Sequence, residues 1–149
     1  VALVEKELNF IEQAKSKLSS NKITFFHCDV NDFNFKKNTF DVIFLSGVSI
    51  YLDDVNFNLL LKKIYYSLKP GGVFIHRDAY SRQKKLTIDK FSKELDLNYF
   101  ALYRTLDEYF DMILKKNNFK LFYSEDMYKY FQDLNKRKET KLRLNIFKK

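Results

Sequence analysis

The stretch that decides the fold reads FDVIFLSG at residues 40–47 and LKPGGVFI at residues 68–75. Neither apolar run alternates with polar residues, which is typical of strands whose two sheet faces are covered by helices. Between them, residues 57–68 place five apolar side chains on one helical stripe, and Asp53 or Asp54 can cap that helix. Strand, helix and strand predict a parallel α/β unit, and such sheets carry their chemistry at the carboxyl ends of the strands.

Two further strands are predicted before this unit. Residues 1–4 and residues 23–28 are apolar or β-branched, and residues 10–18 between them have helical spacing. Each strand is followed by an acid, Glu5 in the first case and Asp29 in the second. The alternation of strands and helices predicts an α/β fold with a Rossmann-like, mostly parallel sheet and helices on both faces.

The second half of the chain departs from this alternation. Residues 77–104 combine polar and aromatic residues with one weak helical stretch at residues 88–95. We interpret residues 77–104 as an insertion that covers the substrate at the open end of the sheet.

The last third predicts a helix and two strands. Thr105 and Glu108 have the spacing of a capping box at the start of a helix. Residues 119–124 predict a strand, and residues 140–146 alternate strictly between apolar and polar side chains. This alternation predicts an antiparallel C-terminal edge strand.

Composition limits the class of protein. A chain of 149 residues with 46% hydrophobic residues can build one core, so we expect a single domain over residues 1–149. The net charge of +8 is dispersed over most segments, which favours a solvated surface over a nucleic-acid partner. The single Cys28 excludes an internal disulfide, and no cluster has metal-ligand spacing, so we expect no metal. No apolar run reaches the roughly 18 residues of a membrane span. We therefore expect a cytoplasmic protein that does not enter the membrane.

The order of the strand ends carries a family resemblance. Glu5, Asp29, the FDVIFLSG stretch and LKPGG follow one another at intervals that resemble class I S-adenosylmethionine-dependent methyltransferases over nearly the whole chain. The resemblance implies S-adenosylmethionine as cofactor and methyl transfer to oxygen or nitrogen of a small molecule. The glycine-rich strand and loop of that family should precede Val1 and are missing. We therefore expect an N-terminally truncated domain with a gap in its sheet.

The same resemblance implies six cofactor-binding positions at three strand ends. A carboxylate at a strand tip accepts hydrogen bonds from both ribose hydroxyls, and adenine offers an amine donor and a ring-nitrogen acceptor. A solvated acid, a turn aspartate and a turn glycine are the structural alternatives. The positions are Glu5 and Lys6 for the ribose, Asp29 and Val30 for the adenine, and Ser46 and Gly47 for the methionine portion.

Three residues are candidates for catalysis. The sulfonium already carries a good leaving group, so displacement mainly needs the acceptor atom about 3 Å from the methyl carbon, and a base is optional. Tyr51 stands where related enzymes often have a histidine that faces the acceptor. His76 would suit a base with a near-neutral pKa, and Asp78 would bind a cationic amine or take a proton.

An aromatic and cationic cover over the acceptor is predicted from residues 77–104. Its candidate substrate-binding residues are Arg77, Tyr80, Tyr103 and Arg104, with Tyr99 beside them. The alternatives are surface packing for the tyrosines, an ion pair between Arg77 and Asp78, and a core position for His76.

Two other functions stay open at this stage. A methyltransferase-like fold can serve as a non-catalytic interaction or nucleic-acid-binding module. A nicotinamide dinucleotide oxidoreductase also has a ribose-binding acid after its second strand. The sequence predicts neither the methyl acceptor nor the oligomeric state.

Overall fold

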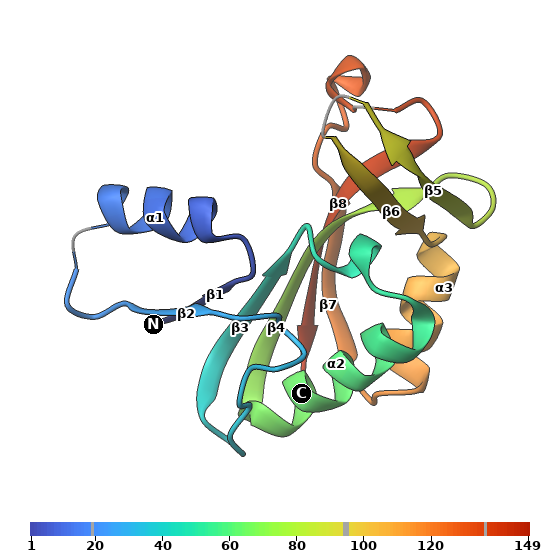
Figure 1. Ribbon diagram of the computed structural model, residues 1–149. Helices are drawn as coiled ribbons and strands as arrows, with labels where there is room; N and C mark the ends of the chain where they lie inside the picture. The colour runs from blue at the N-terminus through green and yellow to red at the C-terminus, as the bar shows by residue number, and fades with distance from the viewer. Residues whose placement is uncertain (19, 94–95, 136) are drawn as a thin grey trace. The chain divides into compact units, whose positions relative to one another are not determined.

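The computed structural model describes residues 1–18, 20–93, 96–135 and 137–149, and its ribbon is drawn in Figure 1. The chain forms two compact units, Val1–Phe35 and Lys36–Lys149.

The first unit is a strand, a helix and a strand. β1 (Ala2–Glu5) is followed by α1 (Leu8–Lys17) and β2 (Thr24–His27). The two strands are parallel, with Glu5 opposite His27, so their carboxyl ends lie at the same edge. The predicted order of elements is confirmed, and the residues that follow each strand lie next to one another.

The second unit is built on the deciding stretch. β3 (Phe40–Ser46) leads through the short 3-10 helix η1 (Ser49–Tyr51) into α2 (Asp54–Ser67), and β4 (Leu68–Ser81) follows directly. β3 and β4 are parallel, with Ser46 opposite Arg77. The predicted parallel α/β unit is therefore confirmed, although β4 runs on to Ser81, beyond the stretch of residues 68–75.

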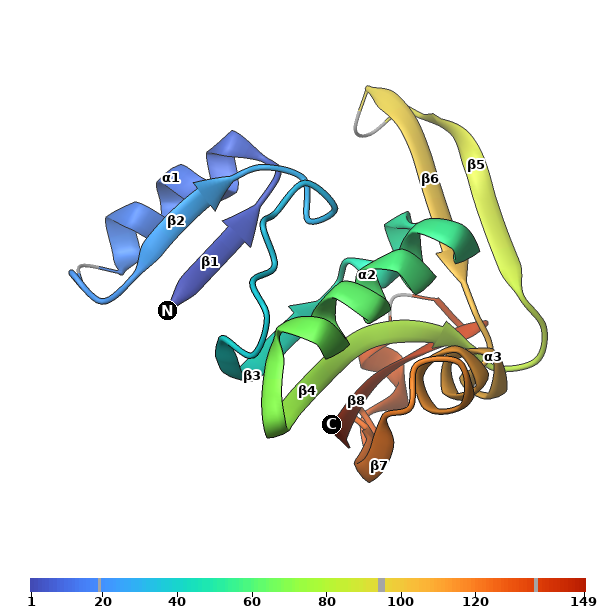
Figure 2. The same ribbon diagram turned by 90° about the horizontal axis from the view of Figure 1, so that it is seen from below.

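α2 is stabilised by a capping aspartate at its start and by a buried apolar stripe along one face. The Asp53 side chain accepts a hydrogen bond from the Asn56 backbone N–H at 2.7 Å, which caps the helix. The helix lies along β4 (Figure 2). Its apolar stripe is buried. Fully buried members of that stripe are Phe57, Leu60, Leu61 and Ile64. Burying such a stripe is the main source of stability for a helix of this length.

Two antiparallel strands complete the larger sheet, whose order is β3-β4-β8-β7. β7 comprises Lys120–Asp126 and β8 comprises Thr140–Lys148, and β8 runs antiparallel to both of its neighbours. The predicted antiparallel orientation of β8 is confirmed. The prediction that this C-terminal strand lies at the edge of the sheet is wrong, because β8 pairs with β4 on one side and with β7 on the other, and β7 is outermost. β1 and β2 form a separate two-stranded sheet within the first unit.

The predicted helical stretch at residues 88–95 is wrong. β5 (Leu86–Ser92) and β6 (Leu97–Tyr103) form an antiparallel hairpin, in which Ile88 pairs with Ala101. The predicted stretch reaches into residues 94 and 95, which lie outside the described residues. Apolar residues three apart fit a helix, but pairing with a second strand prevails here. The hairpin packs on η1 through a small core that contains Ile50, Ala101 and Tyr103.

The helix predicted after Thr105 begins as expected. Thr105 and Glu108 form the complete capping box at the start of α3 (Leu106–Phe110). The helix then continues as a π-helical turn, η2 (Asp111–Lys115), and a last 3-10 turn, η3 (Gln132–Leu134), lies between β7 and β8. The capping box therefore fixes where this segment starts, close to the carboxyl end of β4.

Candidate functional site

Glu5 is held at the carboxyl end of β1. Its Oε1 accepts hydrogen bonds from the backbone N–H groups of Lys6 at 2.7 Å and Glu7 at 2.9 Å. These contacts orient the carboxylate at the tip of the strand. The second oxygen, Oε2, keeps its lone pairs for other donors, because a carboxylate has about four acceptor positions.

Asp29 and Val30 lie after the neighbouring strand. Asp29 Oδ1 accepts from the Asn31 N–H at 2.9 Å, and its Oδ2 lies 3.7 Å from Lys6 Nζ. Val30 follows in the same turn and is half-buried. The Lys6 ion pair thus links the two strand ends, and the structure brings all four residues predicted for ribose and adenine to one edge of the first unit.

Ser46 and Gly47 end β3 in the second unit. Ser46 Oγ accepts from Arg77 Nη1 at 3.0 Å, and the Gly47 N–H donates to the Arg77 carbonyl oxygen at 2.9 Å. Gly47 has a φ of 68°, a conformation that favours glycine, and a Cβ there would meet no atom within 4 Å. Arg77 therefore pairs with Ser46 and not with Asp78, beside open space at the strand end.

Asp78 lies below this edge and is only 4% exposed. Its Oδ2 accepts from the Ser49 backbone N–H at 2.8 Å and from Ser49 Oγ at 2.6 Å. Burial raises the pKa of Asp78, and the hydrogen bonds from Ser49 and from the Ala79 N–H oppose that rise. The carboxylate holds the start of η1 and does not reach the surface.

His76 is a core residue that is 1% exposed. Its ring lies among Phe57, Phe74 and Tyr109, with centroid distances of 5.1 to 6.0 Å. Burial, with a smaller contribution from the Arg104 charge, lowers the pKa of His76 to about 3. The ring is therefore neutral at physiological pH, which differs from the near-neutral pKa that the sequence suggests.

Ser49 and Tyr109 join this network and were not predicted from the sequence. Ser49 Oγ lies 3.0 Å from His76 Nε2 and 3.0 Å from the Tyr109 hydroxyl. Both residues are buried, and burial raises the pKa of Tyr109. The helical spacing after Thr105 marks Tyr109 as a core residue, but its hydroxyl partner is 60 residues away in sequence.

Arg104 is completely buried and binds the backbone that carries η1. Its guanidinium donates to the carbonyl oxygens of Ser49 at 2.9 Å and Leu52 at 2.8 Å, and to Asp54 Oδ1 at 2.8 Å. It also lies 4.9 Å from the Phe57 ring centroid, within cation–π distance. The predicted cover residue is thus a positioning residue for the loop that presents Tyr51.

Tyr51 faces outward from η1 and is 52% exposed. Its ring meets that of Tyr99 edge to face at 6.1 Å, and the Tyr99 hydroxyl lies 3.4 Å from the Tyr103 hydroxyl. Burial and the contact with Tyr99 raise the pKa of Tyr103 to about 12, and the nearby Arg137 guanidinium opposes this rise. We call these three tyrosines and Arg137 the tyrosine cluster.

Tyr80 does not join the tyrosine cluster. Its hydroxyl donates to Asp126 Oδ1 at 3.0 Å, and the Arg143 guanidinium lies 5.8 Å from its ring centroid. This predicted substrate-binding residue is therefore engaged between β4 and β7.

Within the described ranges, no group of three or more His, Cys, Asp or Glu side chains is arranged to hold a metal ion. No helix in the described part of the chain is long and apolar enough to cross a membrane.

Comparisons with known proteins show what the chain is similar to. Residues 1–72 match a family described as a methyltransferase domain. A phosphoethanolamine N-methyltransferase of Plasmodium falciparum is 32% identical over 127 residues, which are 85% of this chain and 47% of that protein. The chain therefore spans about half the length of this curated relative.

Solved structures show the same fold. One is a protein from Listeria monocytogenes assigned as an S-adenosylmethionine-dependent methyltransferase, with a TM-score of 0.80 and 18% identity. The superposition covers all of this chain and 79% of that protein. Phosphoethanolamine N-methyltransferase 2 of Haemonchus contortus, with phosphomonomethylethanolamine and S-adenosylhomocysteine bound, has a TM-score of 0.70 and 17% identity over all of this chain and 43% of its own. Residues 1–72 therefore match a methyltransferase-domain family, and the chain has the fold of S-adenosylmethionine-dependent methyltransferases.

Proposed function

We propose that the protein transfers the methyl group of S-adenosylmethionine to the nitrogen of a small amine that carries a phosphate, with phosphoethanolamine as the first compound to test. The observation that carries this proposal is the match of 127 residues to a phosphoethanolamine N-methyltransferase. The match favours a methyltransferase over the nicotinamide-dependent alternative. It also favours nitrogen over oxygen as the acceptor atom.

The donor side of the proposed site uses the residues at the strand ends. Glu5 Oε2 accepts from the ribose hydroxyls, and Lys6 supports it through its ion pair with Asp29. Asp29 and the Val30 N–H take the adenine edge, while Ser46 and Gly47 line the path of the methionine portion. The open space beside Gly47 supports this last assignment.

The acceptor side of the proposed site is the tyrosine cluster, with Arg77 near the donor. A guanidinium and phenol hydroxyls are donors that suit a phosphate group, so Arg137, Tyr99 and Tyr103 would hold that end of the acceptor. Tyr51, the most exposed of the three tyrosines, would face the amine. Its ring stabilises the positive charge that develops on nitrogen during methyl transfer.

His76, Asp78 and Arg104 act in this proposal without touching the acceptor. S-adenosylmethionine supplies a methyl group on a sulfonium, whose sulfur leaves without needing a proton. The amine nitrogen reacts as its free base, after its proton has passed to solvent, and the N–C bond forms as the C–S bond breaks. The protein therefore has to hold the unprotonated amine, exclude water and align the nitrogen with the methyl carbon. Asp78 and Arg104 fix the backbone of residues 49–54, and through it Tyr51, while the buried neutral His76 supports Ser49.

The test compares two acceptors that differ by the phosphate. S-adenosylhomocysteine formation is measured with phosphoethanolamine and with ethanolamine, and we expect kcat/KM to be higher for the phosphorylated amine. Arg137→Ala should raise the KM for phosphoethanolamine roughly tenfold and leave ethanolamine unchanged, because it removes one charge-assisted contact. Lys138→Ala, an exposed change of equal charge next to it, is the control.

Two results would contradict the proposal. Equal kcat/KM for the two amines would contradict the proposal that the tyrosine cluster binds the phosphate of the acceptor. Failure of both S-adenosylmethionine and S-adenosylhomocysteine to bind at millimolar concentration in a calorimetric titration would leave the non-catalytic module as the better interpretation.

A further inference from the structure

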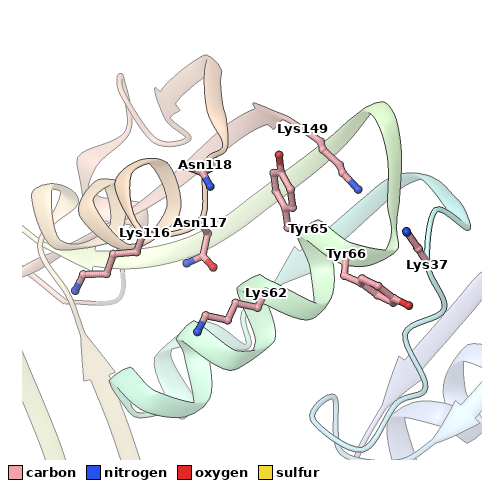
Figure 3. A pocket seen from close by; sticks show the side chains of 8 residues that line it. All are labelled: Lys37, Lys62, Tyr65, Tyr66, Lys116, Asn117, Asn118 and Lys149. Atoms are coloured by element: carbon pink, nitrogen blue, oxygen red, sulfur yellow. The ribbon is translucent and has the colours of Figure 1, made fainter.

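A lysine-rich groove opens at the end of the larger sheet that is opposite to Ser46 and Arg77. It has a volume of about 320 Å³ and is lined by four lysines, two tyrosines and two asparagines (Figure 3). Lys37 precedes β3, and Lys149 follows β8, whose Lys148 pairs with Val73 in the first half of β4. The groove therefore lies away from the strand ends that carry the proposed methyl-transfer site.

The groove concentrates positive charge. No acidic side chain is among the described residues that line it. In the described part of the chain, neither Lys37 nor Lys62 forms an ion pair, and Lys116 shares Asp111 with Lys115 at 3.3 Å each. Figure 3 shows the ammonium groups of Lys37 and Lys149 pointing toward one another. An anion between these groups would relieve their repulsion.

Lys149 is held in place by the fold. Its Nζ donates to the Leu68 carbonyl oxygen at 2.6 Å and to Asn38 Oδ1 at 3.2 Å. The ammonium also lies 4.9 Å from the centroid of the Tyr65 ring. Because an ammonium has three N–H donors, one remains for a ligand, and the side chain loses little freedom when it binds.

Two neighbouring tyrosines of α2 add aromatic surface. Tyr65 is fixed by an edge-to-face contact with Phe119 at 5.1 Å, whereas Tyr66 is 51% exposed. Both line the same groove as the lysines (Figure 3). A planar group can stack on such a ring while an attached phosphate meets the ammonium groups.

We propose that this groove binds a nucleoside phosphate, with the phosphates on Lys37 and Lys149 and the base on Tyr66. Its volume is in the range of small-molecule sites and suits one nucleotide better than a polymer. The proposal does not depend on the methyltransferase activity, because it uses none of the residues assigned to donor or acceptor.

The experiment titrates the protein with uridine diphosphate and with inorganic pyrophosphate by calorimetry at low salt. We expect uridine diphosphate to bind more tightly, with an affinity that falls as salt is added. The double variant Lys37→Ala, Lys149→Ala should weaken both ligands roughly tenfold or more, because two charge-assisted contacts are lost. Tyr66→Ala should weaken only uridine diphosphate, since pyrophosphate has no base to stack.

Matched variants separate this groove from other positive surfaces. Lys84→Ala changes the same charge on an exposed residue that does not line the groove, so the affinity should stay unchanged. Glu5→Ala should also leave it unchanged, which shows that the donor site is not being measured. The proposal is overturned if uridine diphosphate fails to bind at millimolar concentration, or if both ligands bind equally. It is also overturned if a single-stranded oligonucleotide binds more than tenfold tighter through the same lysines.

Discussion

The two parallel strand pairs, β1–β2 and β3–β4, differ in how the charged side chains near their carboxyl ends are buried and hydrogen-bonded. Glu5 and Asp29 are half-buried and bind backbone N–H groups one or two residues away. Asp78 and Arg104 are buried, and both bind the loop around Ser49, which is distant in sequence. A locally held acid can change ligand affinity without disturbing the fold, whereas a buried charge determines the shape of the loop that it binds.

The largest effect should come from removing a buried cation. Arg104→Met leaves the carbonyl oxygens of Ser49 and Leu52 without their donor, and we expect the free energy of unfolding to fall by about 3 kcal/mol. Lys85→Met is the matched control, because Lys85 binds the same Asp54 carboxylate at 2.7 Å from an exposed position. Lys85→Met should lower the free energy of unfolding by less than about 1 kcal/mol. Chemical denaturation measures the free energy of unfolding of both variants. Equal decreases for Arg104→Met and Lys85→Met would contradict the claim that the buried cation contributes more to stability than the exposed one.

The buried histidine should make stability depend on pH. The pKa of His76 is about 3 in the folded protein and 6.5 when unperturbed, so the unfolded chain binds the proton first as the pH falls. The stability that this residue contributes is therefore present above pH 6.5 and is lost as the pH falls toward 3. We expect His76→Gln to reduce this loss by on the order of a few kcal/mol in denaturation experiments across that range. An unchanged pH profile would show that the imidazole is solvated.

A substitution of Glu5 at the end of β1 should change the affinity for the ligand and not the stability of the fold. Glu5→Ala is expected to weaken S-adenosylhomocysteine binding more than tenfold, because the acceptor for the ribose hydroxyls is lost. The melting temperature should stay nearly unchanged, since the lost hydrogen bonds are short-range and exposed. Glu7→Ala, two residues away and exposed, should change neither quantity. Unaltered affinity in Glu5→Ala would remove Glu5 from the donor site.

Neutralising the buried acid should change how the free energy of unfolding depends on pH, in the direction opposite to that of His76. Burial raises the pKa of Asp78 above 3.8, so the folded protein holds a proton that the unfolded chain releases as the pH rises. Stability from this group is therefore lost as the pH rises from 3.8 through the folded pKa. Asp78→Asn lacks this loss, so its free energy of unfolding relative to that of the unmodified protein should rise as the pH increases from 4 to 7. The opposite slope would mean that the hydrogen bonds from Ser49 outweigh burial.

The parts of the fold that depend on local sequence could be predicted. The strands and helix of residues 40–75 follow from apolar spacing and a capping aspartate, and the Thr105 capping box acts within three residues. Residues 88–92 have the spacing of a helix and form a strand, because their partner strand begins at Leu97. Pairing between segments is not encoded in the spacing of either one alone.

In the candidate site too, the residues placed by local sequence could be predicted, and those placed by long-range contacts could not. Glu5 and Asp29 could be predicted because each follows its own strand, and the structure places both at one edge. The roles of Ser49, Tyr109 and Arg104 depend on contacts that span 29 to 60 residues, and nothing near them in sequence indicates their partners. Arg104 was therefore predicted as part of a cover, although it is a buried support.

The Ser49 hydroxyl determines the direction of proton donation through the network around it. It has one proton, which it donates to Asp78, so its two lone pairs are left to accept from His76 Nε2 and from the Tyr109 hydroxyl. This arrangement selects the tautomer of His76 with the proton on Nε2 and leaves Nδ1 as the unpartnered atom, which is what the described residues show. Among the other amino acids, only threonine offers the same aliphatic hydroxyl with one donor and two acceptors, so this position in the loop admits very few substitutions.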